Sequence, residues 1–69
     1  SKLENGLGKV IGYTILPKNQ KDEEKAVVYI EDINGDRKVL ISYDKATLQN
    51  MGEEEWVGKS VKFKGEYLV

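Results

Sequence analysis

Residues 27–43 run Val27-Val28-Tyr29-Ile30-Glu31-Asp32-Ile33-Asn34-Gly35-Asp36-Arg37-Lys38-Val39-Leu40-Ile41-Ser42-Tyr43 and predict two β-strands joined by a tight turn. The pair Asn34-Gly35 suits the centre of a type I′ turn, because both central residues of that turn need positive φ. A two-residue turn there sets how the strands pair, with Ile30 opposite Val39 and Glu31 opposite Lys38. The hairpin thereby separates a core face from a surface that could bind a ligand.

Each side chain of the hairpin is assigned to one face, because successive side chains of a strand point to opposite sides. The expected core face carries Val28, Ile30, Val39 and Ile41, with Asp32 paired to Arg37 at its open end. The expected outward face carries Val27, Tyr29 and Leu40, with Glu31 paired to Lys38. A register shifted by one residue would exchange the faces and bury the Glu31–Lys38 pair, at a large desolvation cost.

The chain before the hairpin predicts a lead-in, a strand and a loop. Residues 1–6 are expected to fray, since they contain few apolar side chains. Residues 8–16 are rich in β-branched and aromatic residues and predict a long strand, which Gly12 can bend or bulge and Pro17 ends. Residues 18–25 are all polar and indicate an exposed loop.

The chain after the hairpin predicts a short helix and a last strand. The helix is expected over Asp44–Gly52, with Asp44 capping its first amides and Gly52 ending it in a left-handed conformation. Leu48 and Met51 lie on one helix face and are expected to plug one end of a barrel. The last strand is expected over Val61–Val69, with Gly65 available for a bulge.

The composition excludes most enzyme classes. The 69 residues form one domain, 1–69, and include neither Cys nor His. The chain therefore lacks disulfides, thiolate zinc sites, cysteine nucleophiles, serine–histidine triads and histidine-metal hydrolase sites. The carboxylates that could act as acid or base have structural roles instead: Asp32 is expected to pair with Arg37 across the hairpin, and Asp44 is expected to cap the helix. We therefore expect no catalysis and no cofactor.

The charges nearly cancel, with 11 basic and 12 acidic residues and a net charge of −1, so there is no overall bias toward polyanions. The run Glu53–Glu55 indicates an exposed acidic turn, because contiguous glutamates do not give the spaced oxygens of a calcium site. No apolar run approaches the roughly 20 residues of a membrane helix. We expect a cytoplasmic protein without a metal site or a membrane partner.

The order of these elements resembles the OB-fold. The residues that carry the resemblance are Gly8-Lys9-Val10-Ile11-Gly12-Tyr13, Val28-Tyr29-Ile30-Glu31-Asp32-Ile33-Asn34-Gly35 and Trp56-Val57-Gly58-Lys59-Ser60-Val61-Lys62-Phe63-Lys64-Gly65. They look like the anticodon-binding and single-stranded-DNA-binding branch of that fold. The resemblance implies a mainly β, small, OB-like, partly open five-stranded barrel with one short helix. An SH3-like barrel, with short strands and a single helical turn, is the alternative.

An OB-fold has five strands, whereas this sequence ends about where the fifth would begin. One solution is that the two long segments, Gly8–Leu16 and Val61–Val69, each bend at a glycine and count twice. Otherwise the barrel stays open and leaves the C-terminal strand as an edge. Such an edge is a surface on which another strand can pair. This strand could therefore form a homodimer with a second copy of the chain.

The OB-fold resemblance implies a module that binds single-stranded nucleic acid, which needs aromatic platforms beside cations. The candidate residues for nucleic acid or another partner are Tyr13, Tyr29, Lys38, Leu40, Lys62 and Lys64, with Lys9 as a further cation. Each also has a structural explanation, since strand tyrosines are usually core or rim residues and alternating lysines usually protect an edge.

A protein–protein interaction module or small protein inhibitor is the alternative function. It would use the same outward patch of Val27, Tyr29 and Leu40, with Trp56, because aromatic residues dominate interface hot spots. Affinity for single-stranded nucleic acid that decreases as the salt concentration rises would distinguish nucleic acid binding from protein binding.

Overall fold

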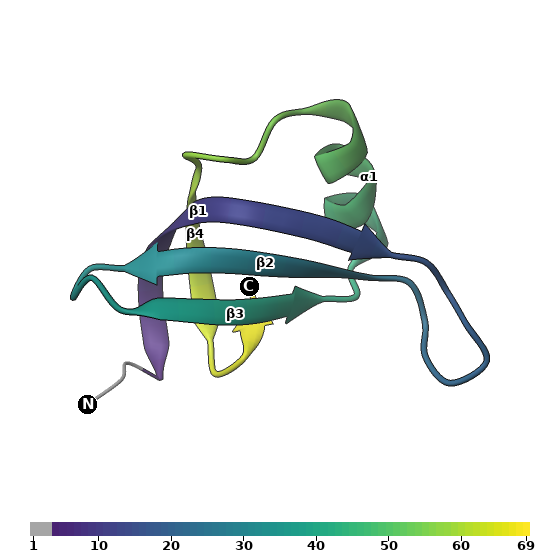
Figure 1. The fold of residues 1–69 in the computed structure, drawn as a ribbon, viewed down its shortest axis with the longest axis horizontal. Coiled ribbons are helices and arrows are strands. Elements are labelled where there is room, and N and C mark those ends of the chain that lie inside the picture. Colours follow the sequence, from purple (N-terminus) through teal and green to yellow (C-terminus); the bar gives the residue numbers. More distant parts are fainter. Residues whose placement is uncertain (1–3) are drawn as a thin grey trace.

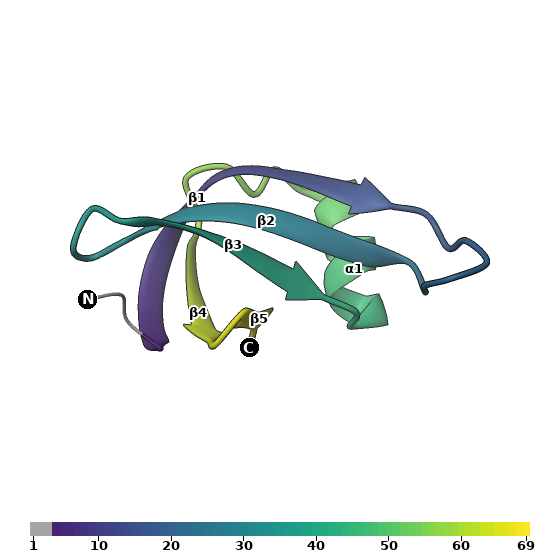
Figure 2. The same ribbon diagram turned by 60° about the horizontal axis from the view of Figure 1, so that its bottom comes forward.

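The structure is a computed structural model that describes residues 4–69. Its elements are β1 (Asn5–Leu16), β2 (Lys25–Asp32), β3 (Arg37–Ser42), α1 (Lys45–Glu53), β4 (Ser60–Lys64) and β5 (Tyr67–Leu68). The strands form a closed barrel in the order β1-β2-β3-β5-β4, and β4 pairs back to β1. Figures 1 and 2 show α1 beside the end of β1. The expected mainly β, five-stranded barrel with one short helix is confirmed, and it is closed rather than partly open.

Strand β1 is long enough to serve two sides of the barrel. Its residues 5–9 pair antiparallel with β4, and its residues 8–16 pair antiparallel with β2. Ile11 is an extra residue between Val10 and Gly12 and forms a bulge. A bulge bends and twists its strand, which confirms the bend expected near Gly12. The expected frayed lead-in is wrong for Asn5 and Gly6, which belong to β1, and its residues 1–3 lie outside the described residues.

The turn between β2 and β3 has three residues rather than two. The Gly35 amide donates to the Asp32 carbonyl, and the Asp32 amide donates to the Asp36 carbonyl. Among the loop residues only Gly35 has a positive φ, at 82°, whereas a type I′ turn needs two such residues. The Asp32 Oδ1 atom also accepts the amides of Asn34 at 2.9 Å and Asp36 at 3.0 Å. These hydrogen bonds hold the longer loop.

The longer loop shifts the pairing of β3 by one residue. Tyr29 lies opposite Val39, Val28 opposite Leu40 and Glu31 opposite Arg37. The faces expected for β2 are confirmed, because Val28 and Ile30 are buried and Tyr29 is exposed. The faces expected for β3 are wrong: Leu40 is buried, and Val39 and Ile41 point outward with Tyr29 and Val27. The Asp32–Arg37 and Glu31–Lys38 pairings do not form, because the register is shifted.

The core fills the barrel and continues under the helix. The buried apolar side chains are Val10, Ala26, Val28, Ile30, Leu40, Leu48, Met51, Trp56, Val61 and Phe63, and Tyr13, Ile15 and Leu68 pack against them. Leu48 and Met51 are the buried residues of α1, which confirms that the helix plugs the barrel. Asp44 caps α1 by accepting the Thr47 amide at 3.0 Å. The expected stop at Gly52 is wrong, because α1 ends at Glu53 and its C-cap is an extended Glu54.

The expected segment Val61–Val69 consists of two strands. Gly65, at φ 60°, lies in the turn between β4 and β5. Strand β5 pairs antiparallel with β4 and parallel with β3, at Ile41 and Tyr67. These short pairings close the barrel, so the C-terminal strand is not the free edge on which the expected homodimer depended.

Candidate binding surfaces

The outward surface of β1, β2 and β3 carries an exposed apolar cluster. Gly12, Tyr29 and Val39 lie in one row across the three strands, and Ile11 is set beside them by the bulge. Tyr29 is 44% exposed, Val39 49% and Ile11 41%. With Arg37, these four residues line a shallow hollow of about 360 Å³ that Lys38 also borders. We call Ile11, Gly12, Tyr29, Arg37 and Val39 the Tyr29 face.

Gly12 leaves space beside the Tyr29 ring. A Cβ atom at Gly12 would lie 4.0 Å from the Tyr29 Cδ2 atom, at van der Waals contact. Without that side chain, the ring and the adjoining backbone form an open apolar surface. A planar group could therefore approach the ring from solvent without displacing a neighbour.

Charges of both signs flank the Tyr29 face. Lys9 of β1, Glu31 of β2 and Arg37 of β3 lie in one row across the strands, and all three are exposed. Glu31 stands between the two cations, so the row is not a continuous basic strip. The Tyr29 face is consequently an apolar surface with a guanidinium at one end.

Tyr13, a candidate from sequence, does not lie on the Tyr29 face. Its ring packs against the core, and its hydroxyl donates to the Glu55 Oε2 atom at 2.8 Å. The same hydroxyl accepts the Trp56 amide at 3.4 Å. The hydrogen bond to Glu55 is the main cause that raises the pKa of Tyr13 above its ordinary value. Tyr13 thus ties β1 to the segment that leads into β4.

Three other candidates have surroundings that differ from those expected. Leu40 is fully buried, so its place on an outward binding face was wrong. Trp56 is 7% exposed, and its indole Nε1 donates to the Asn50 Oδ1 atom at 2.9 Å, so it is a core residue. The Lys38 Nζ atom lies 5.2 Å from the centre of the Phe63 ring, and Lys38 stands opposite the core residue Ile30.

Lys62 and Lys64 lie on a different surface from Tyr29. They project from β4, opposite Leu7 and Asn5 of β1, and all four residues are exposed. Of the sequence candidates, Tyr29 alone belongs to the Tyr29 face, and Lys62 and Lys64 lie on a second surface that shares only β1 with it. Val39 and Ile11 were missed as surface residues, and the bulge signal at Gly12 was the sequence feature that could have indicated Ile11.

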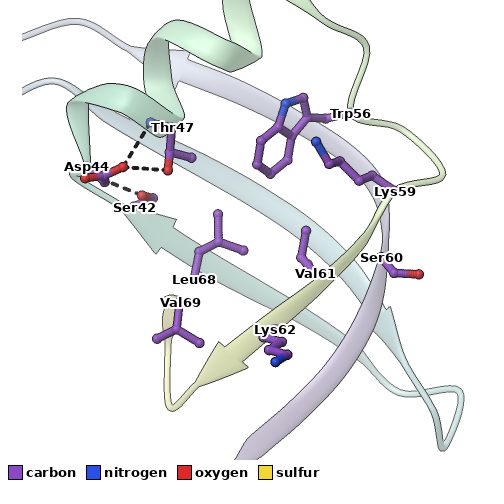
Figure 3. Close-up of a pocket in the computed structure, with 10 residues that line it drawn as sticks. All are labelled: Ser42, Asp44, Thr47, Trp56, Lys59, Ser60, Val61, Lys62, Leu68 and Val69. Atoms are coloured by element: carbon purple, nitrogen blue, oxygen red, sulfur yellow. Dashed lines mark hydrogen bonds between the residues drawn. The ribbon is translucent and has the colours of Figure 1, made fainter.

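A second hollow, of about 490 Å³, lies between α1, β4 and β5 (Figure 3). The polar groups at its α1 end bind one another: the Asp44 amide donates to the Ser42 hydroxyl, and the Thr47 hydroxyl and amide donate to the Asp44 carboxylate. The Thr47 hydrogen bonds lower the pKa of Asp44. The Lys59 Nζ atom lies over the Trp56 ring, 4.4 Å from its centre. Ser42, Asp44 and Thr47 therefore serve the helix cap, and Lys59 packs on Trp56, so these residues have structural roles in the hollow.

Within residues 4–69, no group of three or more acidic, Cys or His side chains is arranged to hold a metal ion. The helix in that range is too short and too polar to cross a membrane.

No protein-family model matches the chain, and neither does a curated protein or a solved structure. What these surfaces can bind is therefore argued from their geometry and chemistry.

Proposed function

We propose that this protein is a non-catalytic binding module that holds single-stranded nucleic acid on the Tyr29 face. The observation that carries the proposal is the exposed Tyr29 ring, with open space beside it at Gly12 and a guanidinium at Arg37. An aromatic ring stacks on any base, and such stacking is worth about 1–3 kcal/mol per base. Arg37 can pair with a phosphate or stack on a base.

The barrel topology supports the proposal. The strand order, the parallel pairing of β3 with β5 and the helix between β3 and β4 are compatible with an OB-like barrel. In OB-folds, oligonucleotides bind over the second and third strands, which here carry Tyr29, Arg37 and Val39. Helix α1 has nine residues, more than the single helical turn of the SH3-like alternative.

The alternative function is a protein–protein interaction module or a small protein inhibitor that uses the same face. The apolar side chains of Ile11, Tyr29 and Val39 favour it, because a protein partner could bury all three. Glu31 also favours it, since a carboxylate beside the face repels phosphate. The two functions differ in their response to salt, because only phosphate binding releases condensed counterions.

An NMR titration of the labelled protein with oligothymidylate, at low and at moderate salt, tests the proposal. We expect salt-sensitive shifts at the amides of Gly12, Tyr29 and Val39, while the amides around Leu48 and Met51 stay unchanged. Oligouridylate, added in parallel, compares an RNA strand with the DNA strand. Absence of shifts at low salt with both oligonucleotides would contradict the proposal and favour a protein partner.

A further inference from the structure

Three lysines project from one surface on β1 and β4, among residues that are otherwise uncharged. The outward residues of the paired segments are Asn5, Leu7 and Lys9 of β1 and Ser60, Lys62 and Lys64 of β4, and all six are exposed. We call these six residues the β4 face. Val61 and Phe63 alternate with them and are buried. Figure 3 shows Ser60 and Lys62 pointing away from the side to which Val61 points.

The β4 face contains no acidic residue, and its lysines have no ion pair. Within residues 4–69, Lys18 pairs with Glu23 and Lys25 with Asp22, whereas no salt bridge involves Lys9, Lys62 or Lys64. Lys62 and Lys64 are two residues apart on one strand, about 6–7 Å. Their opposite neighbours, Leu7 and Asn5, are uncharged. Lys62 and Lys64 therefore repel each other without an acidic neighbour across the strand, whereas Lys9 has Glu31 opposite it on β2.

Protection of a sheet edge does not explain these lysines. Alternating lysines commonly prevent an exposed edge strand from pairing with another chain. Here β4 is paired on both sides, with β1 and with β5, and is an interior strand of the closed barrel. The lysines thus carry a cost in repulsion that the fold does not require. A polyanion would remove that repulsion, because its phosphates supply the missing negative charge.

The β4 face adjoins the Tyr29 face along β1. Lys9 pairs with Glu31 on one side and with Ser60 on the other, so it stands where the two surfaces meet. Figures 1 and 2 show β1 sweeping from β4 along the whole length of β2. A single-stranded nucleic acid that leaves the Tyr29 face near Lys9 can therefore continue along β1 to Lys62 and Lys64.

We propose that the β4 face binds the phosphates of the nucleic acid strand whose bases occupy the Tyr29 face. This inference rests on the proposed function and extends it. The protein binds long single strands more tightly than short ones, because only a long strand reaches both surfaces. Base stacking on Tyr29 and phosphate binding on the β4 face are separable contributions.

The test compares a four-nucleotide and a twelve-nucleotide oligothymidylate, which span the range of about 4–16 nucleotides that one OB-type barrel occupies. Affinity is measured by fluorescence anisotropy across a salt series. The variant is Lys62→Gln with Lys64→Gln, and the matched control is Lys21→Gln with Lys45→Gln, two exposed lysines on the loop after β1 and on α1. Both variants change the net charge equally.

We expect the Lys62→Gln/Lys64→Gln variant to bind the twelve-mer more weakly and the four-mer as the unaltered protein does. For a single strand, each phosphate contact contributes about −0.7 to the slope of log affinity against log salt. The slope for the twelve-mer should therefore become less steep by about 1.4 in the variant and stay unchanged in the control. Lys9→Gln provides a second, independent variant, with an expected change of about 0.7.

An unchanged slope and unchanged length dependence in the variants, with binding still lost in Tyr29→Ala, would overturn this inference alone. Failure of the unaltered protein to bind either oligonucleotide would overturn the proposed function and this inference together. Binding to vesicles of anionic lipid that depends on Lys62 and Lys64, without an effect on the twelve-mer, would assign the β4 face to a membrane surface and also overturn it.

Discussion

Gly8 lies directly against Ile30, so closely that a Cβ atom on Gly8 would fall 2.5 Å from the Ile30 Cδ1 atom. The same Cβ would lie 3.2 Å from the Glu31 carbonyl oxygen, which is backbone and cannot move aside easily. Ile30 is fully buried, so any movement of its side chain would displace other core residues, and its Cβ atom would also lie 3.3 Å from the added Cβ. The glycine therefore allows β1 to approach β2 where β1 also pairs with β4.

Gly8→Ala is expected to destabilise the protein by about 1–3 kcal/mol, because overpacking forces side chains and backbone to shift. The matched control is Gly52→Ala in α1, where nothing lies within 4 Å of the added Cβ. That change should stabilise by about 0.5–1 kcal/mol, since Ala loses less conformational freedom in a helix. Urea denaturation measures both, and a shift of the two midpoints in the same direction would contradict the packing argument.

The Asp32 carboxylate holds the hairpin loop, and its two oxygens differ. Oδ1 accepts the Asn34 and Asp36 amides, whereas Oδ2 is buried and has no hydrogen-bond partner within residues 4–69. Asp32→Ala removes both hydrogen bonds and should cost about 1–3 kcal/mol. Asp32→Asn keeps the accepting oxygen and should cost about 1 kcal/mol or less. Thermal denaturation compares the two, and equal losses would show that the Oδ1 hydrogen bonds do not hold the loop.

Asp22 joins the loop after β1 to the end of β3. Its carboxylate accepts a hydrogen bond from the Lys25 ammonium group at 2.8 Å and another from the Tyr43 hydroxyl at 3.1 Å. The Lys25 hydrogen bond is the main cause that lowers the pKa of Asp22 below its ordinary value of 3.8. The same contact raises the pKa of Lys25, and burial together with Asp22 raises the pKa of Tyr43.

Because the pKa of Asp22 is lower in the folded protein, its contribution to stability is present above the ordinary value of 3.8 and is lost as the pH falls through the folded value. We expect Asp22→Asn to lower the melting midpoint at pH 7 and to leave it nearly unchanged at pH 2. Glu24→Gln, a change at an exposed loop residue, should lower it at neither pH. An equal loss at both pH values for Asp22→Asn would show that the charge of Asp22 does not stabilise the fold.

The architecture was largely predictable from local signals. The alternation of apolar residues along β2, the cap at Asp44 and the bend near Gly12 each depend on neighbours in the sequence, and each is found in the structure. Of the two long segments expected to count twice, the first is a single strand, β1, although it pairs with both β2 and β4. The second segment does form two strands, because it turns at Gly65 between β4 and β5.

The candidate site was less predictable, because it depends on one residue of register. The Asn34-Gly35 pair predicted a two-residue turn, but the Asp32 carboxylate stabilises a three-residue loop by accepting two amides. The Asn34-Gly35 motif alone does not predict these hydrogen bonds. The resulting shift exchanges Leu40 for Val39 on the outward surface. The closure of the barrel, which places Lys62 and Lys64 on an interior strand, is a tertiary feature that no local pattern indicates.

Tyr29 and Ile30 are neighbours in β2 that point to opposite sides, so they separate binding from stability. Ile30→Ala empties a fully buried position and should cost about 2–5 kcal/mol of unfolding free energy. Tyr29→Ala should reduce stability only modestly, because the ring is 44% exposed, yet weaken oligothymidylate binding by about 1–3 kcal/mol. Calorimetric titration and urea denaturation on the same variants measure both quantities.

Tyr43→Ala is the matched control for the binding measurement, because Tyr43 is 43% exposed but contacts Asp22 instead of the Tyr29 face. We expect it to leave affinity for oligothymidylate unchanged. If Tyr43→Ala and Tyr29→Ala weakened binding equally, stacking on the Tyr29 ring would not be the source of affinity. If Tyr29→Ala unfolded the protein, the ring would be a structural side chain, since loss of a half-exposed surface residue does not remove a core.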